Sequence, residues 1–375
     1  MFDVVLTSNY SPWSRYSGGG QKSTHMLACA YASLGYRVAV VYTKAPFESV
    51  DVPKGLPYTV RFALFFSILP TMGSVLRWLN GIPVYFKVRQ LSNENTVVIG
   101  NGDESSLLGH VRKKDFLYCT RFPNPPEWLK GVNWNSPVGR MMVFFREPRF
   151  AAIAMAMGHA RSVACTSRDS LLQTARAFPL SAQKLRVVPN GVDPMFLESP
   201  CKDSAGHGIL FFGRLTASKG ILDLIEAYLA MPKDLQVTHS LMIVGHGPLT
   251  QKIESMIGTV DHIRLVSWLD SSSLCELIRQ HRMVVLPSHE ESFGNTMLET
   301  IAMGQDLLTC NAGSIPEVVE DQACLVPPDS PGLLRNAMLE CLAKPFDPDL
   351  AIMKREWVRS RYSWKVTASR LLEGV

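Results

Sequence analysis

The chain has 375 residues, more than one hydrophobic core normally supports, because single domains rarely grow beyond about 250–300 residues; two domains are therefore expected. Hydrophobic residues make up 46% of the chain and charged residues 19%, a composition that excludes extensive disorder. The 38 basic and 33 acidic residues leave a net charge of +5, which suits anionic substrates or an anionic membrane surface, and no nucleic-acid-binding motif accompanies it.

The cysteines and the start of the chain indicate a reducing compartment. Eight cysteines are scattered between Cys29 and Cys341 without a C-x-x-C pair, so we expect free thiols and no metal-ligand set. The first residues predict a strand directly, so we expect no signal peptide. The longest apolar run without charge, Phe62 to Leu76, falls short of the roughly 20 residues that a membrane helix needs. We therefore expect a cytoplasmic protein, either free or peripheral on the cytoplasmic face of the membrane.

The first elements predict the beginning of a doubly wound parallel sheet. Asp3 to Thr7 predicts a buried strand, Gln21 to Leu34 a helix and Arg37 to Tyr42 a second strand. The loop before the helix ends in three glycines that let a phosphate or a sugar approach the backbone closely, Gly18, Gly19 and Gly20. A flexible loop would use glycines in the same way, while the P-loop and dinucleotide-binding patterns are both absent.

Residues 59–90 are rich in apolar and aromatic side chains, a composition typical of either a core helix or a contact with a membrane or lipid acceptor. A basic group at residues 110–114, followed by further arginines, is either a solvated face or a surface for anionic lipid.

Two further predicted strands each end beside charged residues. Val97 to Ile99 leads to Asp103 and Glu104, and Phe116 to Thr120 leads to Arg121. Because ligands of open parallel sheets bind at the carboxyl ends of the strands, these side chains are candidates for ligand contacts.

A polar, turn-rich stretch from Phe196 to His207 predicts the linker between the domains. The second domain begins with a strand, Gly208 to Phe212, and passes through the turn GRLTASKG into a helix from Ile221 to Ala230. Arg214 and Lys219 lie on this turn, where the fork of an arginine and the point charge of a lysine suit a diphosphate. Two surface cations without a ligand would produce the same pattern.

The stretch from Pro287 to Glu317 combines a strand end, a turn and a helix. Asn295 is the predicted N-cap of a helix that runs from Thr296 to Met303. The free amides of a helix N-terminus favour an anion such as a phosphate. Glu291 on the loop and Glu299 inside the helix could accept hydrogen bonds from sugar hydroxyls, although ordinary solvated glutamates would give the same spacing.

Five short elements resemble those of glycosyltransferase family 4, the retaining enzymes of the GT-B fold, and they follow one another along the chain in the family's order. The two glutamates of the family motif, separated by seven residues and with Phe-Gly after the first, correspond to Glu291 and Glu299. The G-R-x-x-x-x-K-G element corresponds to residues 213–220, and the V-G-x-G-P-L element to residues 244–249. The glycine loop and a hexad at residues 188–193 complete a resemblance that covers nearly the whole chain.

The resemblance implies an α/β chain of GT-B fold, in which two Rossmann-like doubly wound parallel-sheet domains face a central cleft. The N-terminal, acceptor-binding domain would span residues 1–197, and a C-terminal helix at about residues 360–375 would cross back onto it. The nucleotide-sugar-binding domain would span residues 206–358. Closure of the two domains over the donor would exclude water.

The resemblance also implies individual roles. Arg214, Lys219 and Glu291 would be catalytic, with the two cations on the donor diphosphate and the carboxylate on the donor sugar. Glu299 would bind the ribose. The remaining donor-binding residues would be Gly18, Gly19, Gly20, Gly213, Gly245, Ser292, Phe293, Gly294, Asn295 and Thr296. Acceptor or sugar contacts would come from Asp103, Glu104 and Arg121.

The chain departs from the family pattern at three places. Many members carry a histidine close to the donor sugar after the strand at residues 116–120, and here Arg121 stands nearest. Asp306 stands where the family has a proline, and Ser314 replaces a glycine. Both of these departures are expected near the site.

The implied activity is retaining, metal-independent transfer of a hexosyl-type sugar from a nucleotide-diphosphate sugar, without another cofactor. The partners would be this donor, a glycan or lipid-linked acceptor and an anionic membrane surface, with no nucleic acid. Cell-surface polysaccharide or glycoconjugate biosynthesis is the expected setting. Two alternatives remain open at this point: a catalytically weak, membrane-associated scaffold of the same fold, and a nucleotide-sugar epimerase that needs no acceptor.

Overall fold

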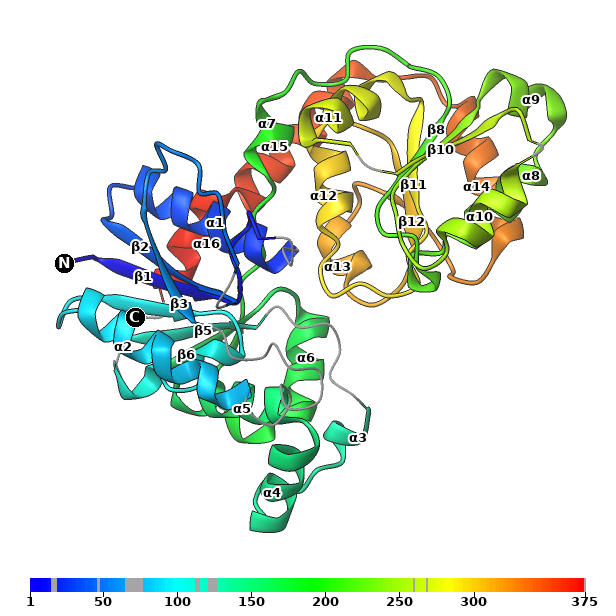
Figure 1. Ribbon diagram of the computed structural model, residues 1–375. Helices are drawn as coiled ribbons and strands as arrows, with labels where there is room; N and C mark the ends of the chain where they lie inside the picture. Colours follow the sequence, from blue (N-terminus) through cyan, green and yellow to red (C-terminus); the bar gives the residue numbers. More distant parts are fainter. Residues whose placement is uncertain are drawn as a thin grey trace. The chain divides into compact units, whose positions relative to one another are not determined.

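The computed structural model describes residues 1–14, 19–45, 48–64, 77–111, 115–120, 127–258, 260–267 and 269–373. The chain divides into two compact units, which are Met1–Gly191 together with Trp364–Val375, and Val192–Ser363. Each unit is built on one parallel sheet (Figure 1). The predicted α/β class with two parallel-sheet domains is therefore confirmed.

The sheet of the first unit has the strand order β3-β2-β1-β4-β5-β6-β7, and all of its pairs are parallel. The order reverses between β1 and β4, which is the position where ligands of doubly wound sheets bind. The strands are β1 (Val4–Ser8), β2 (Val38–Lys44), β3 (Thr59–Leu64), β4 (Val97–Gly100), β5 (Phe116–Thr120), β6 (Ser162–Cys165) and β7 (Leu185–Val187).

The helices of the first unit include the last helix of the chain, α16, which lies beside α1 (Figure 1). The hydroxyl group of Tyr31 on α1 donates a hydrogen bond to the carbonyl of Ala368 on α16, at 3.1 Å. The helices are α1 (Gly19–Ser33), α2 (Gly81–Leu91), α3 (Glu127–Lys130), α4 (Pro137–Arg146), α5 (Pro148–His159), α6 (Arg168–Ala177) and α16 (Trp364–Leu372), with 3₁₀ turns η1 (Arg77–Asn80), η2 (Asp103–Ser105), η3 (Leu108–His110) and η4 (Pro179–Lys184).

The sheet of the second unit has the order β10-β9-β8-β11-β12-β13 and is also parallel throughout, with its reversal between β8 and β11. Its strands are β8 (Ile209–Phe212), β9 (Leu241–Val244), β10 (Ile263–Val266), β11 (Met283–Leu286), β12 (Leu307–Cys310) and β13 (Cys324–Val326). Its helices are α7 (Pro194–Glu198), η5 (Ala217–Lys219), α8 (Ile221–Leu229), α9 (Lys233–Thr238), α10 (Thr250–Ile257), α11 (Ser271–Gln280), α12 (Asn295–Ala302), α13 (Ile315–Val319), α14 (Pro331–Ala343) and α15 (Pro348–Tyr362).

Four central strands are buried along their whole length, as expected where helices cover both faces of a parallel sheet: β1, β8, β11 and β12. The helix α8 shows how a covering helix is anchored, since Ile221, Leu224, Ile225 and Tyr228 recur at helical spacing and are buried in the core of the second unit. No helix in the described ranges is long and apolar enough to cross a membrane. All eight cysteines are free, as predicted.

The structure corrects three expectations about elements. Residues 59–90 include the strand β3 as well as the helix α2, and most of the apolar run from Phe62 to Leu76 lies outside the described residues. The stretch predicted as a linker begins at Phe196, which lies inside the helix α7. Phe196 is buried in the core of the second unit, so this part of the stretch belongs to that unit. The strand β12 and the helix α15 have no counterpart in the prediction.

Candidate functional site

The loop after β11 leads into α12 through a single left-handed glycine. Gly294 has φ +84 and is the residue before the helix, whereas Asn295 is the first helical residue and makes no capping bond. The prediction of Asn295 as N-cap is therefore wrong. The physical reason is that glycine adopts a positive φ without a steric penalty, so the chain turns directly into the helix. The amides at the start of α12 remain a suitable place for an anion.

The carboxylate of Glu291, on this loop, forms an ion pair with the ammonium group of Lys219. The same oxygen, Oε1, accepts a weaker hydrogen bond of 3.4 Å from the hydroxyl group of Ser288. The Glu291 side chain is 12% exposed and the Lys219 side chain 27% exposed, so the pair lies near the surface and is partly screened by protein. The structure thus brings together two of the three residues predicted to be catalytic.

The third of these residues, Arg214, lies on the same turn as Lys219 and is exposed. The described chain offers its guanidinium group no ion pair. Arg214 directly follows Gly213, which has φ +148 and no atom within 4 Å of the position that a Cβ atom would take. The accessible backbone of Gly213 and the unpaired guanidinium group of Arg214 suit an anionic ligand, because such a ligand could contact both of them without displacing other groups.

The turn that bears Lys219 packs tightly against the loop that bears Glu291. Gly220 has φ +62, and a Cβ atom there would lie 1.9 Å from the carbonyl oxygen of Pro287. The amide of His289 donates a hydrogen bond to the carbonyl of Ser218, at 2.9 Å. The two loops meet because they follow β8 and β11, which are neighbours at the reversal of the strand order.

Ser314 fixes the backbone of Glu291 from the opposite side. Its amide and its hydroxyl group both donate to the Glu291 carbonyl oxygen, at 3.2 Å and 2.9 Å. Ser314 is fully buried, and a Cβ atom on the preceding Gly313 would lie 2.8 Å from the same oxygen. The residue that departs from the family pattern therefore adds a hydrogen bond that a glycine could not make, a role that sequence reasoning missed.

The other predicted donor-binding residues of this unit differ in their exposure to solvent. Gly245 is a packing residue, since a Cβ atom there would lie 1.9 Å from the carbonyl oxygen of Gly213. Phe293 is buried with its ring 6.0 Å from that of Tyr362. Ser292, Thr296 and Glu299 are partly exposed on the loop and the first turns of α12.

Asp306 lies away from this site, which corrects the expectation that it sits nearby. It precedes β12 and therefore lies at the amino edge of the parallel sheet, whereas Glu291 follows the carboxyl end of β11. Its carboxylate accepts hydrogen bonds from Arg282 at 2.6 Å and Lys354 at 2.7 Å. The departure from the family proline thus serves a structural ion cluster.

The predicted residues of the first unit lie at the reversal between β1 and β4. Asp103 and Glu104 are fully buried in η2 after β4. Glu104 accepts hydrogen bonds from the hydroxyl groups of Thr7 and Ser105, both at 3.1 Å. Burial and the neighbouring Asp103 raise the pKa of Glu104 to about 7. Neither carboxylate reaches the surface, so a contact with a ligand would require the surrounding residues to move.

The glycine loop of the first unit is only partly described. Gly19 and Gly20 are the first residues of α1 and have open space around their Cα atoms. Gly18 and Arg121 lie outside the described residues.

Comparisons with known proteins show what these loops are similar to. Residues 206–344 match the family model described as Glycosyl transferases group 1. D-inositol 3-phosphate glycosyltransferase of Segniliparus rotundus is 28% identical over 210 residues, which cover 51% of this chain and 46% of the relative. Glycogen synthase of Mycobacterium tuberculosis is 34% identical over 148 residues, covering 36% of this chain and 34% of the relative. The chain spans about half the length, or less, of the curated relatives it matches.

Solved structures match almost the whole chain at low identity and so establish its fold. Sucrose-phosphate synthase from Thermosynechococcus elongatus has a TM-score of 0.73 at 19% identity and covers 99% of this chain and 97% of its own. WaaG, a glycosyltransferase involved in lipopolysaccharide biosynthesis, has a TM-score of 0.69 at 16% identity, with 98% coverage of both chains. Anabaena HepE in complex with UDP and glucose has a TM-score of 0.67 at 17% identity, covering 100% of this chain and 99% of its own.

The folds of these neighbours, the two parallel sheets and the family match agree. The chain has the GT-B fold, and its residues 206–344, which hold Arg214, Lys219, Glu291 and Glu299, are similar to the group 1 glycosyltransferases.

Proposed function

We propose that the chain is a retaining glycosyltransferase that moves a sugar from a nucleotide-diphosphate sugar to a hydroxyl group of a glycan, a glycolipid or another acceptor. The contact between Lys219 and Glu291 carries this proposal. It places a cation suited to a diphosphate and a carboxylate suited to sugar hydroxyls on neighbouring loops at the carboxyl edge of one sheet. Both residues lie within the match to the group 1 glycosyltransferases.

In the proposed reaction, the bond between the anomeric carbon and the diphosphate oxygen breaks, a bond to the acceptor oxygen forms on the same face of the sugar, and the proton of the acceptor hydroxyl group passes to the departing diphosphate. Negative charge grows on the departing diphosphate. Lys219, Arg214 and the amides at the start of α12 would stabilise this charge, and such electrostatic contributions are typically worth several kcal/mol. We propose that these groups suffice without a bound metal ion.

The ion pair suggests how donor binding is coupled to sugar recognition. Without a ligand, Lys219 and Glu291 neutralise each other on the partly screened surface. A diphosphate would offer Lys219 a more highly charged partner, and Glu291 would then be free to accept hydrogen bonds from the donor sugar. Glu299, one turn inside α12, is the proposed contact for the ribose.

The names of the relatives support a setting in glycan assembly. Among them are an MMP alpha-(1->4)-mannosyltransferase of Mycolicibacterium hassiacum, 26% identical over 189 residues, and O-antigen chain mannosyltransferase B of Escherichia coli, 26% identical over 162 residues. We propose that this chain acts in cell-surface polysaccharide or glycoconjugate biosynthesis, with its acceptor presented at the cytoplasmic face of a membrane.

The helix α4 supports a peripheral contact with an anionic membrane. Four large apolar side chains of this ten-residue helix are exposed, Val138, Met141, Met142 and Phe145, and two arginines accompany them, Arg140 and Arg146. An exposed apolar face with basic neighbours is typical of helices that lie in a membrane interface.

Calorimetric titration with UDP, GDP and ADP tests the donor site. We expect one of the three nucleotides to bind the wild type and to lose that affinity in Lys219→Ala. Lys233→Ala is the matched control, because Lys233 is an exposed lysine on α9 of the same unit. Absence of binding by all three nucleotides would contradict the proposal and favour a scaffold of the same fold.

The stereochemistry of the product is tested separately. A retained anomeric configuration in the product, followed by NMR, distinguishes a retaining from an inverting enzyme. Donor turnover without an acceptor would instead indicate an epimerase.

A further inference from the structure

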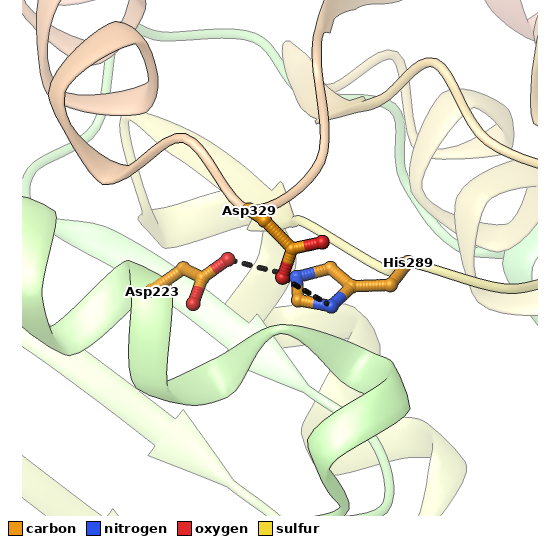
Figure 2. A group of neighbouring side chains, drawn as sticks. All are labelled: Asp223, His289 and Asp329. Carbon is orange, nitrogen blue, oxygen red and sulfur yellow. Dashed lines mark hydrogen bonds and ion pairs between the residues drawn. The ribbon is translucent and has the colours of Figure 1, made fainter.

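His289 is held between two carboxylates that approach different nitrogens of its ring, as Figure 2 shows. Its Nε2 lies 2.8 Å from Oδ2 of Asp223, and its Nδ1 lies 3.3 Å from Oδ1 of Asp329. The histidine and Asp223 are about one-fifth exposed, whereas the Asp329 side chain is 81% exposed. The ring is therefore fixed at both nitrogens near the protein surface.

The two carboxylates come from elements far apart in the sequence. Asp223 lies in the first turn of α8, directly after the turn that bears Lys219. Asp329 lies between β13 and α14 and has φ +52, a left-handed conformation that is uncommon for residues other than glycine. The Asp329 carboxylate thus lies against His289 although the Asp329 side chain is 81% exposed.

His289 belongs to the loop that bears Glu291 and ties it to the turn that bears Lys219. Its amide donates to the carbonyl of Ser218, at 2.9 Å. Its ring is fixed by α8, which continues from that turn, and by the loop before α14. The side chain thus anchors the middle of the loop, two residues before Glu291, to two other elements of the same unit.

Both ring contacts can be hydrogen bonds only when the imidazole is protonated at both nitrogens, because a neutral ring has a single N–H group. Several other charged or titratable groups surround the ring. Cys310 at the end of β12 is near enough to both aspartates that burial, Asp223 and Asp329 raise its pKa to about 12. Glu290 and Glu291 lie on the same loop, and Lys219 is paired with Glu291. The two aspartates are the groups in direct contact with the ring.

The same three side chains are close enough together to hold a metal ion. The geometry favours a hydrogen-bonded clamp instead, because the two carboxylates lie beside different ring nitrogens. One ligand atom of each residue nevertheless lies within 4.8 Å of the other two, so a divalent cation is the alternative occupant, which a Zn²⁺ titration distinguishes.

We propose that His289, as an imidazolium ion clamped by Asp223 and Asp329, is a positioning residue that holds the Glu291 loop against the Lys219 turn for binding of the nucleotide-sugar donor. This inference rests on the proposed function, since the loops are those of the proposed donor site. It predicts that donor affinity depends on a side chain that does not touch the donor.

The experiment combines NMR of the ring with calorimetry of nucleotide binding. In protein labelled with ¹⁵N-histidine, both ring nitrogens of His289 are expected to carry protons, with the signal assigned through His289→Gln. Asp329→Asn removes one carboxylate at an exposed position and should leave the unit folded. It is expected to weaken binding of the nucleotide that the wild type binds by roughly 3- to 30-fold, the range for coupling through a positioned loop. Asp234→Asn, an exposed aspartate on α9, is the control.

The number of protons on the His289 ring, compared between the wild type and Asp329→Asn, provides the readout that a merely structural role would not move. His289→Gln, which cannot hold both carboxylates as the ring does, is expected to weaken nucleotide binding as Asp329→Asn does. Wild-type affinity in both His289→Gln and Asp329→Asn would overturn the inference while leaving the proposed function intact. Failure of the wild type to bind any nucleotide would overturn both. Stoichiometric Zn²⁺ binding that is lost in Asp329→Asn, or a ring with one proton, would also overturn it.

Discussion

The ammonium group of Lys219 and the carboxylate of Glu291 form an ion pair although 72 positions separate them in the sequence. They meet because their loops follow β8 and β11, which are neighbours in the sheet at the point where the strand order reverses. Three further contacts hold the loops in place, from Gly220, His289 and Ser314. The pair is therefore part of a prearranged site rather than a chance contact of two surface charges.

Loss of the Lys219 charge should affect turnover more than folding. Lys219→Ala is expected to lower kcat/KM for the donor at least ~100-fold, because stabilisation of the leaving diphosphate is lost. Steady-state kinetics with the nucleotide sugar that the wild type uses would measure this. The thermal midpoint should change little, since a partly exposed ion pair contributes only about 0–1 kcal/mol to stability. Turnover equal to that of the wild type would refute the role of Lys219.

Removal of the Ser314 hydroxyl group should loosen the Glu291 backbone. Ser314→Ala loses one of two hydrogen bonds to the Glu291 carbonyl, and a net loss of about 0.5–1.5 kcal/mol in the free energy of unfolding is expected. Because the loop bears the proposed sugar contact, KM for the donor should rise several-fold while the nucleotide alone binds almost as before. Chemical denaturation and kinetics of the same variant check the two effects, and an unchanged KM would contradict the positioning role.

Glu104 should make the stability of the chain depend on pH. Burial and the neighbouring Asp103 raise its folded-state pKa from 4.5 to about 7. Its contribution to stability is therefore fully present below about pH 4.5 and is lost as pH rises through 7. Glu104→Gln removes this dependence and should gain stability relative to the wild type, on the order of 2–3 kcal/mol between pH 5 and 8.

The measurement for Glu104 is urea denaturation of both proteins at several pH values. Glu94→Gln is the control, because Glu94 is an exposed glutamate of the same unit. A difference between Glu104→Gln and the wild type that stays constant across the series would show that Glu104 does not titrate in this range.

Asp306 should be essential for the stability of the second unit. Burial raises its pKa, but Lys354 and Arg282 outweigh that effect, so the pKa lies below its usual range. The stability it contributes is present above the unfolded-state pKa and is lost as pH falls through the folded value. Asp306→Asn leaves two buried cations without their carboxylate and is expected to cost about 3–5 kcal/mol.

Denaturant unfolding of Asp306→Asn tests this, with Asp349→Asn, an exposed aspartate in the first turn of α15, as the control. A loss below about 1 kcal/mol would mean that the two cations find other partners. Nucleotide binding by the folded fraction should be unaffected, because the cluster lies at the amino edge of the sheet.

The exposed apolar face of α4 should govern binding to lipid vesicles. Replacement of Met141 and Phe145 by serine is expected to lower cosedimentation with vesicles of an anionic phospholipid while leaving donor turnover on a water-soluble acceptor unchanged. The substitution Leu172→Ser, at an exposed leucine of α6, is the matched control. Equal cosedimentation of the double variant and the wild type would exclude α4 as the contact.

The sequence by itself determined the class of the fold and the residue types of the site. The strand β5 was predicted with its observed bounds, Phe116–Thr120, because a short apolar run followed by a turn identifies a buried parallel strand locally. Arg214, Lys219, Glu291 and Glu299 were predicted as site residues because short motifs around them resemble those of a known family. These signals lie within a few residues of one another, so they can be recognised without knowing what packs against them.

Only the tertiary structure decided which of these residues meet and what holds them. The contact of Lys219 with Glu291, the hydrogen bonds from Ser314 and the clamp on His289 all join segments that are distant in the sequence. The burial of Asp103 and Glu104 and the placement of Asp306 at the other edge of the sheet depend on strand order in the same way. Strand order is set by packing over the whole domain, so no local pattern specifies it.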